Sequence, residues 1–359
     1  MSEKKWMIYG ANGYTGELIA REARKRYLKP VLAGRNKKAI PTLAKELDLE
    51  FQLFDLASSS DILKHFLNID LVLNCAGPFT QTSKPIIEAC LASKTHYFDI
   101  TGEIAVFEAI RKQEYQARQR GIMLMPGIGF DVVPTDCLAL QLVNELPSAN
   151  TLTLAIDSQG HTSHGTAITM LEGLKNGGRV REFGNIKPVS IVHKVREIPF
   201  PHKTKTCVTI PWGDVSTAYY TTGIPNIEVF SAMPKNQINQ LRLLKYVKPL
   251  IKLSSFQKAF LKQLANDQKG PEEKERDQTK CTIWGQVKNQ RGKTREAVLT
   301  TPNGYTLTVQ TALAIVEHFL KNPFKKGVHT PAKLMGEHFI ETIPGVRLDF
   351  DKKQTKTKA

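Results

Sequence analysis

The chain has 359 residues, of which 41% are hydrophobic, 8% aromatic and 23% charged. This composition is typical of a soluble globular protein and excludes a disordered chain, a collagen-like chain or a small disulfide-stapled domain. The length predicts two domains, or one domain split by a large insertion. The formal net charge of +16 favours an anionic partner, which could be a phosphorylated cofactor, an acyl thioester, an anionic lipid or a nucleic acid.

The five cysteines lie far apart and form no cluster with metal-ligand spacing, so we expect reduced thiols and no metal site. The first residues lead into a strand-like stretch at 6–9 without the apolar core of a signal peptide. The sequence has no run of about 18 apolar residues, so no membrane-spanning helix is predicted. The expected location is therefore cytoplasmic, and residues 351–359, with four lysines, are expected to be a frayed tail.

The first 130 residues alternate between short apolar stretches and amphipathic stretches. Strands are predicted at 6–9, 30–33, 50–54, 70–74, 96–100 and 122–125, and helices at 16–27, 37–47, 61–67, 85–92 and 105–120. Such alternation predicts right-handed βαβ units and an α/β fold with a parallel sheet covered on both faces.

Three glycines follow the first predicted strand with GxxGxxG spacing. The run is Gly10, Ala11, Asn12, Gly13, Tyr14, Thr15 and Gly16, and a helix follows it directly. Glycine is needed where the chain turns sharply and where backbone amides approach a pyrophosphate, and the helix N-terminus attracts phosphate. The pattern therefore predicts a dinucleotide-binding turn, with a purely structural turn as the alternative.

The end of the second predicted strand indicates which dinucleotide is bound. An NAD site usually has an acidic residue there, but this chain has Arg35 and Asn36, followed by two lysines. A guanidinium pairs well with a 2′-phosphate, and no carboxylate is present to repel it. NADP(H) is the predicted cofactor, and a solvated basic loop is the alternative.

The remaining strand ends are expected to face the same crevice, because ligands of such sheets bind beyond the carboxyl ends of the strands. Asp55 closes the third strand, where it could meet the adenine amino group or hold a simple turn. The fourth strand ends in small residues that let the backbone run beside a cofactor, namely Cys75, Ala76, Gly77 and Pro78.

These segments resemble the saccharopine dehydrogenase-like oxidoreductases, in the subgroup that includes bacterial trans-acting enoyl reductases. The likeness lies in residues 10–16, 33–35, 74–79, 97–103 and 129–136, and later in 163–167, 211–229, 283–287, 301–308 and 330–346. It implies a doubly wound Rossmann domain at 1–130 and an inserted mixed α/β domain at 131–304. It also implies C-terminal helices within 305–359 that pack back on the first domain.

The residue pattern after 131 agrees with an inserted domain, because the βαβ rhythm stops. Strands are predicted at 151–156, 205–210, 215–221, 227–232 and 281–287, and helices at 166–174 and 305–320. Residues 229–266 carry seven basic residues and no acidic one, with apolar residues at helical spacing. This pattern suits an anionic membrane surface or a flap over a lipid-like substrate, and ordinary surface helices are the alternative.

Hydride transfer usually needs an acid that protonates the product. No tyrosine has a lysine four residues later, which argues against a classical short-chain reductase. The predicted catalytic acids are Asp131, Glu103 and Asp99. Asp131 fits a structural cap equally well. Further crevice candidates are Tyr14, Asp136, Trp212, Asp214 and the pair His161 and His164, which solvated loop histidines would also explain.

Three functions remain open. The first is an NADP-dependent reductase of an activated C=C bond in a lipid or acyl intermediate. The second is a saccharopine-type C–N dehydrogenase or reductase, and the third is a non-catalytic protein that binds NADP or a membrane surface. The expected partners are a small lipid-like or acyl substrate, an anionic membrane contacted peripherally through 229–266, and a second copy in a homodimer. Nucleic acid is not expected, because the basic residues form no nucleic-acid-binding motif.

Overall fold

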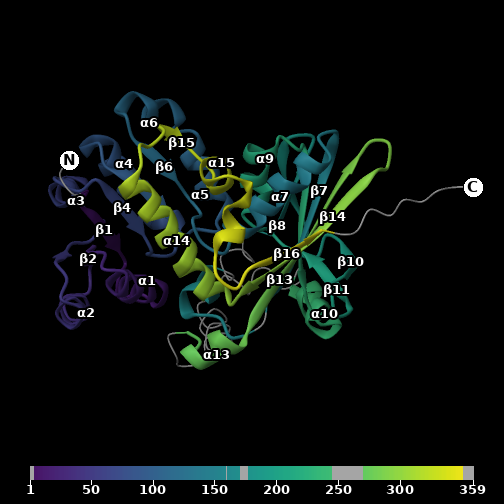
Figure 1. Cartoon of the computed structure of the whole chain (residues 1–359), viewed down its shortest axis with the longest axis horizontal. Helices are drawn as coiled ribbons and strands as arrows, with labels where there is room; N and C mark the ends of the chain where they lie inside the picture. The colour runs from purple at the N-terminus through teal and green to yellow at the C-terminus, as the bar shows by residue number, and fades with distance from the viewer. Residues whose placement is uncertain (1–3, 159, 170–176, 245–269, 351–359) are drawn as a thin grey trace, which may run out of the picture.

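The computed structural model describes residues 4–158, 160–169, 177–244 and 270–350. Two β-sheets lie side by side, the first built mainly from the N-terminal part of the chain and the second mainly from residues after 148 (Figure 1). The largest apolar core runs without interruption from one sheet to the other. It joins Ile8 and Leu73 of the first sheet, through Leu138 and Leu313, to Leu154 of the second.

The first sheet has seven parallel strands in the order β15-β6-β5-β4-β1-β2-β3. They are β1 (Trp6–Tyr9), β2 (Val31–Gly34), β3 (Phe51–Leu53), β4 (Leu71–Asn74), β5 (His96–Asp99), β6 (Met123–Met125) and β15 (Gly327–Val328). Helices cover both faces, so the central strands are buried throughout, as their continuous apolar runs indicate. The predicted doubly wound parallel sheet is confirmed, and the ends of β1–β6 lie within one residue of the predicted ones.

The helices of this domain differ more from their predictions than the strands do. They are α1 (Tyr14–Lys25), α2 (Ala39–Leu47), α3 (Ser59–Phe66), α4 (Phe79–Ser93), α5 (Ile104–Arg111) and α6 (Glu114–Arg120). The predicted helix at 105–120 is therefore two helices. Helix α4 begins six residues before the predicted start and so contains Pro85. The early start depends on Glu103, which is remote in sequence and caps the helix N-terminus.

The second sheet is mixed, with nine strands. Its main order is β10-β11-β12-β7-β13-β14-β16, and β8 pairs with β12 and β9. The strands are β7 (Ala149–Ser158), β8 (Gly178–Glu182), β9 (Asn185–Val189), β10 (Val195–Pro199), β11 (Thr204–Thr209), β12 (Asn226–Ala232), β13 (Lys280–Asn289), β14 (Thr294–Pro302) and β16 (Arg347–Phe350). Strands β7, β11, β12 and β13 correspond to predicted strands, whereas the others were not predicted. The only parallel pair in this sheet among the described residues is β7 with β12.

The predicted strand at 215–221 is wrong, because these residues form helix α9 (Asp214–Thr222). The sequence is rich in β-branched and aromatic residues, which favours a strand. Its buried residues Val215, Ala218 and Thr221 recur every three positions, however, and pack α9 against helix α7 (Val133–Glu145). Tertiary packing here overrides local propensity.

The C-terminal segment contains more than the expected helices. Helix α14 (Gly304–Lys321) matches its prediction closely and packs against α1. Strand β15 then joins the first sheet, and helix α15 (Pro331–Met335) and a 3₁₀ turn η1 (Glu337–Thr342) lead to β16, which joins the second sheet. This segment therefore ties the two sheets together.

Three expectations fall wholly or partly outside the described residues. The frayed tail at 351–359 is one of them, and the predicted helix at 166–174 is another, of which 166–169 are helical and 170–174 lie outside the description. In the basic amphipathic segment at 229–266, residues 245–266 lie outside the description, and the described part forms the end of β12 and helix α10 (Lys235–Leu244), where Ile238 is buried. None of the helices in the described ranges combines the length and apolar character that a membrane crossing needs. No disulfide joins the five cysteines.

Candidate active site

The glycine turn lies between β1 and α1 and is very tightly built. Gly10 has φ +82°, and a Cβ atom there would lie 2.8 Å from the backbone nitrogen of Ala76. A Cβ atom on Gly16 would overlap the carbonyl oxygen of Gly10, while the N–H of Gly13 donates to the same oxygen at 3.0 Å. Only glycine fits at positions 10 and 16, and a Cβ atom on Gly13 would make a tight contact of 3.2 Å with the carbonyl oxygen of Gly10.

The first turn of α1 has the uncapped backbone amides that this motif predicts for a phosphate site. Gly13 is the N-cap, and no side chain of the described residues caps the helix. The amides of Tyr14, Thr15 and Gly16 therefore sit at the positive end of the helix dipole with no intrahelical acceptor. An anionic group such as a pyrophosphate is the natural acceptor for them.

The end of β2 lies beside this turn, because the N–H groups of Gly10 and Ala11 both donate to the carbonyl of Ala33. Arg35 follows, is exposed, and is engaged by no hydrogen bond or ion pair in the described part of the chain. Burial raises the pKa of Tyr9 to about 12, while the positive charge of Arg35 acts against this rise and the carboxylate of Asp55 adds to it. Arg35 and Asp55 therefore flank one buried ring at the edge of the crevice.

Asn36 and Asp55 both have local structural roles. The Asn36 side-chain oxygen accepts from the amides of Lys38 and Ala39 at 3.0 and 2.9 Å, at the start of α2. Asp55 accepts from the amide of Ala57 at 2.9 Å, which is the turn that the sequence left open as an alternative. Of Arg35, Asn36 and Asp55, Arg35 is thus the residue whose side chain has no hydrogen-bond or ion-pair partner in the described part of the chain.

The end of β4 brings Cys75, Ala76, Gly77 and Pro78 beside the glycine turn. The amide of Cys75 donates to the carbonyl of Tyr9 at 2.8 Å, and the Gly77–Pro78 peptide bond is cis. Glu103 closes this corner, because its two carboxylate oxygens accept from the amides of Phe79 and Thr80 at 2.8 and 2.9 Å. Glu103 therefore caps the N-terminus of α4. The sequence did not predict this role, because Glu103 lies more than twenty residues after the start of the helix.

Asp99 is fully buried and fixes the ends of β5 and β6 to each other. One carboxylate oxygen accepts from the amides of Thr101 and Gly127 at 3.0 and 2.8 Å, and the other accepts from the Tyr97 hydroxyl at 2.7 Å. Burial raises the pKa of Asp99 to about 6. Both oxygens are occupied, so Asp99 positions the crevice backbone and is not placed to protonate a substrate.

Asp131 differs from Asp99 and Glu103, because no hydrogen bond engages its carboxyl group within the described residues. The side chain is partly exposed and lies against the backbone of Gly102, where a Cβ atom would come within 2.5 Å of Oδ2. Burial raises the pKa of Asp131 to about 7, and the charge of Glu103 adds to this rise. A carboxyl group with such a pKa is partly protonated at neutral pH, as a general acid requires.

Two further carboxyl groups lie deeper, at the contact between α7 and α9. Asp136 accepts from the amide of Ala332 at 2.9 Å, and burial raises its pKa to about 6. Burial raises the pKa of Asp214 well above the usual value, a hydrogen bond with Thr135 acts against this rise, and the charges of Asp136 and Asp131 add to it. The indole N–H of Trp212 is buried and lacks a hydrogen-bond partner in the described chain.

The other sequence candidates lie in loops of the second domain. His161 is exposed and pairs with Glu275 at 2.9 Å, while His164 is exposed in a short helical stretch at 164–169. Both fit the solvated-loop alternative. Sequence reasoning did not single out Tyr305, whose hydroxyl accepts from the amide of Ser163 at 2.6 Å and whose ring packs edge-on against Tyr14.

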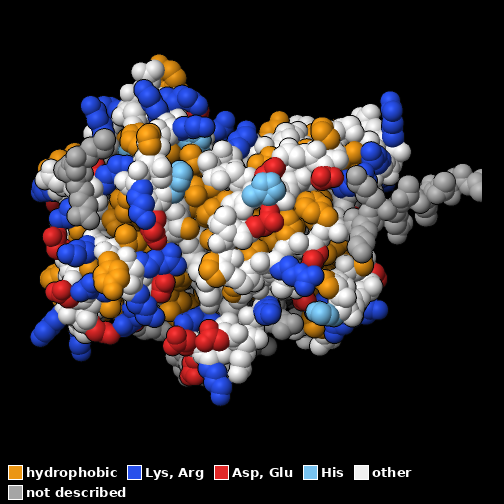
Figure 2. Space-filling view, in the orientation of Figure 1, with side chains coloured by type: hydrophobic (Ala, Val, Ile, Leu, Met, Phe, Trp, Pro, Cys, Tyr) orange, Lys and Arg blue, Asp and Glu red, His pale blue; other side chains and the backbone are white. Residues whose placement is uncertain are grey.

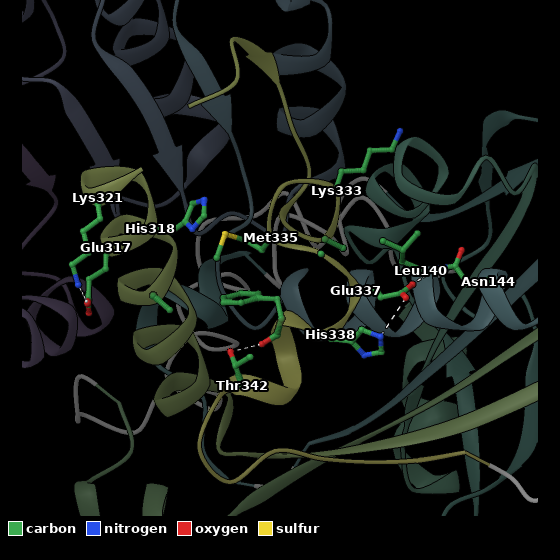
Figure 3. A pocket seen from close by; sticks show the side chains of 14 residues that line it. Leu140, Asn144, Glu317, His318, Lys321, Lys333, Met335, Glu337, His338 and Thr342 are labelled. Carbon is green, nitrogen blue, oxygen red and sulfur yellow. Dashed lines mark hydrogen bonds and ion pairs between the residues drawn. The ribbon is translucent and has the colours of Figure 1, made fainter. Parts of the chain in front are cut away.

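A separate groove of about 910 Å³ lies between α14, α7 and η1 (Figure 3). Its wall includes His318 and Lys321 of α14 on one side and His338 on the other. The ion pairs Lys321–Glu317 and His338–Glu341 neutralise much of its charge. None of the predicted site residues lines it.

Comparison with known proteins connects this geometry to a family. Residues 6–125 match the saccharopine dehydrogenase NADP binding domain. A human saccharopine dehydrogenase-like oxidoreductase is 25% identical over 217 residues, which cover 52% of this chain and 50% of that protein. A Mycobacterium tuberculosis protein, provisionally named a trans-acting enoyl reductase, is 28% identical over 184 residues, which cover 47% of this chain and 43% of that protein. The matches thus span about half the length of these curated relatives.

Among solved structures, apo saccharopine dehydrogenase (L-Glu forming) from Saccharomyces cerevisiae has the same fold. The TM-score is 0.67 at 13% identity, with 97% of this chain and 100% of that one covered. At this identity the likeness concerns the fold alone. The chain is thus similar to the saccharopine dehydrogenase-like oxidoreductases, and residues 6–125 match the NADP binding domain of saccharopine dehydrogenase.

Proposed function

We propose that the protein is an NADP-dependent oxidoreductase that reduces an activated C=C bond in a lipid or acyl intermediate. The observation that carries the proposal is the Asp131 carboxyl group, which lies partly exposed in the crevice, has no hydrogen-bond partner in the described residues, and has a pKa raised to about 7. Glu103, which caps α4, stands close enough to add to this rise. A reductase needs such a group beside its dinucleotide.

The residues present fit an NADP cofactor. The amides at the start of α1 would hold the pyrophosphate, and Arg35 would pair with the 2′-phosphate. Bound NADPH supplies the hydride. The backbone around Cys75–Pro78 borders the adjoining part of the crevice, and Asn36 and Asp55 support its edge through their turns.

In this proposal Asp131 delivers a proton to the substrate carbon next to the activating carbonyl group. Gly102 leaves room for the carboxyl group, and Asp99 anchors the backbone between β5 and β6. Burial and the charge of Glu103 favour the protonated form of Asp131.

The choice of a C=C bond over a C–N bond rests on the arginines. A substrate with several carboxylates needs converging guanidinium groups. The most buried arginine of the second domain, Arg181, instead pairs with Glu108 at 3.2 Å and donates to the carbonyls of Val215 and Gly184. The likeness to a trans-acting enoyl reductase supports the same choice.

The test is NADPH consumption with two substrate panels, α,β-unsaturated acyl thioesters of increasing chain length and imines formed from an amino acid and a keto acid. We expect consumption with the thioesters and a product heavier by two hydrogens in mass spectrometry. Consumption with the imines alone would favour the C–N reaction, and binding of NADPH with turnover of neither panel would favour the non-catalytic alternative. Peripheral membrane contact through 229–266, a homodimer and a cytoplasmic location stay predictions.

A further inference from the structure

The glycine turn is covered by a segment of the second domain. Residues 270–272 and helix α13 (Glu273–Gln278) lie against the ring of Tyr14, the first residue of α1. A Cβ atom at Gly270 would lie 2.8 Å from that ring, and the buried Pro271 accepts a hydrogen bond from the Tyr14 hydroxyl. Tyr305 packs against the same ring, with a centroid distance of 5.0 Å.

Arg276 brings a positive charge to this contact. Its Nη1 atom donates to the Tyr14 hydroxyl at 3.0 Å and to the carbonyl of Pro271 at 2.9 Å. Neither acceptor is charged, and within the described residues no carboxylate pairs with the guanidinium group. Its other N–H groups are therefore open to an anion.

The neighbouring acids are turned away from the glycine turn. Glu272, Glu273 and Asp277 are exposed, and Figure 2 shows acidic side chains gathered on the outer surface over α13. Glu275 is occupied by His161, which it binds through both the backbone amide and the imidazole. Arg276 is half-buried and is the cation of this segment that faces inward.

We propose that Arg276 is a cofactor-binding residue contributed by the second domain, and that it pairs with the pyrophosphate of the dinucleotide held at the glycine turn. The inference rests on the proposed cofactor site. The α1 amides meet the pyrophosphate from the first domain, and Arg276 meets it from the segment above. Guanidinium groups suit this task because they form two parallel, charge-assisted hydrogen bonds to phosphate oxygens. Tyr14 guides the guanidinium by accepting one of its N–H groups.

The test compares three ligands, NADPH, NADH and 2′-AMP, which has the 2′-phosphate but no pyrophosphate. Binding to the full chain is measured by fluorescence and calorimetry for wild type, Arg276→Ala and Arg35→Ala. We expect Arg276→Ala to weaken NADPH and NADH equally, by roughly tenfold, and to leave 2′-AMP unchanged. Arg35→Ala should weaken NADPH and 2′-AMP and spare NADH.

Arg291→Ala, in the exposed β13–β14 turn, is the matched control and should change nothing. If Arg276→Ala does not fold, Arg276→Gln takes its place in the test. Glutamine removes the charge but keeps a side-chain donor for Tyr14, and it should cause the same loss of NADPH and NADH affinity. Unchanged NADPH and NADH affinity in a folded Arg276 variant would overturn the inference, as would a loss that extends to 2′-AMP. A wild type that binds none of the three ligands would instead overturn the proposed cofactor site.

Discussion

The two ends of the crevice are built by different means. At the end formed by β1, α1 and β2, the polar groups are backbone amides and one exposed guanidinium group, that of Arg35. At the end formed by β5, β6 and α7, they are carboxyl groups whose pKa values burial has raised, namely Asp99, Asp131 and Asp136. The first end is suited to hold an anion and the second to hold a proton.

The difference also separates what a local sequence pattern determines from what packing determines. The turn with the uncapped amides depends on glycines three residues apart, and contacts within or beside the turn require glycine at Gly10 and Gly16. The carboxyl groups depend on partners distant in sequence, such as Ala332 for Asp136 and Gly127 for Asp99. Substitutions at the two ends should therefore affect different measurements.

The largest effect is expected for Asp131→Asn. The amide keeps the size of the carboxyl group but cannot give up a proton, so the rate of reduction should fall by roughly 10²- to 10⁴-fold. NADPH affinity should stay within about twofold, because the glycine turn is at the other end. Stopped-flow reduction and NADPH titration measure the two quantities separately. A variant with normal turnover would remove Asp131 from the proposed chemistry.

The pH dependence of the same rate gives a second check. Because the pKa of Asp131 is raised to about 7, the protonated donor is abundant below that pH and is lost above it. The rate of the chemical step should therefore fall as pH rises through about 7, and the residual rate of Asp131→Asn should not show this fall. The same fall in both proteins would assign it to another group.

The next effect is expected for Gly13→Val at the other end. A Cβ atom there would already lie 3.2 Å from the carbonyl oxygen of Gly10, and the branched side chain would occupy the space in front of the amides. NADPH affinity should fall by roughly a hundredfold while circular dichroism stays native. Gly121→Asn, which has φ +72° at the end of α6 and open space around it, is the control. Normal NADPH binding in folded Gly13→Val would contradict a phosphate site at this turn.

Arg35→Ala should have a smaller and more selective effect. We expect a loss of about 1.5–3 kcal/mol in the free energy of NADPH binding and little change for NADH, which is the size of a charge-assisted hydrogen bond. Wild type should accordingly prefer NADPH by at least about tenfold. Fluorescence titration with both cofactors decides the matter, and an equal loss for the two would place Arg35 away from the 2′-phosphate.

Much of the first domain could be predicted from sequence because its signals are local. The strands β1, β2, β4 and β6 are short, mainly apolar stretches, and the glycine turn and Arg35 directly follow β1 and β2 in the chain. The start of α4 could not be predicted, because its cap is Glu103. Helix α9 was mistaken for a strand, because its propensity favours a strand and only packing against α7 decides otherwise.

The functional assignment of the acids shows the same limit. Asp99 ends β5, Glu103 follows it and Asp131 follows β6, so as a sequence pattern all three are acids near strand ends. Their differences arise from their partners. Asp99 and Glu103 accept hydrogen bonds from backbone amides, whereas the Asp131 carboxyl group lies against Gly102 and has no hydrogen-bond partner among the described residues. Tyr305 and Arg276 carried no local signal at all, since their importance comes from their contact with Tyr14.

The smallest effect is expected in stability, from Asp136→Asn. Burial raises the pKa of Asp136 to about 6, above the value near 4 of the unfolded chain. Between these values the folded state binds more protons than the unfolded state. The free energy of unfolding therefore falls progressively as pH rises from about 4 to 6. Above that range the contribution of this group is fully lost. Asparagine keeps the acceptor for the Ala332 amide and does not titrate. The stability of the variant relative to wild type should therefore rise across this range by about 1–3 kcal/mol. Urea unfolding at several pH values measures it, and parallel pH profiles for the two proteins would show that Asp136 titrates alike in the folded and unfolded states.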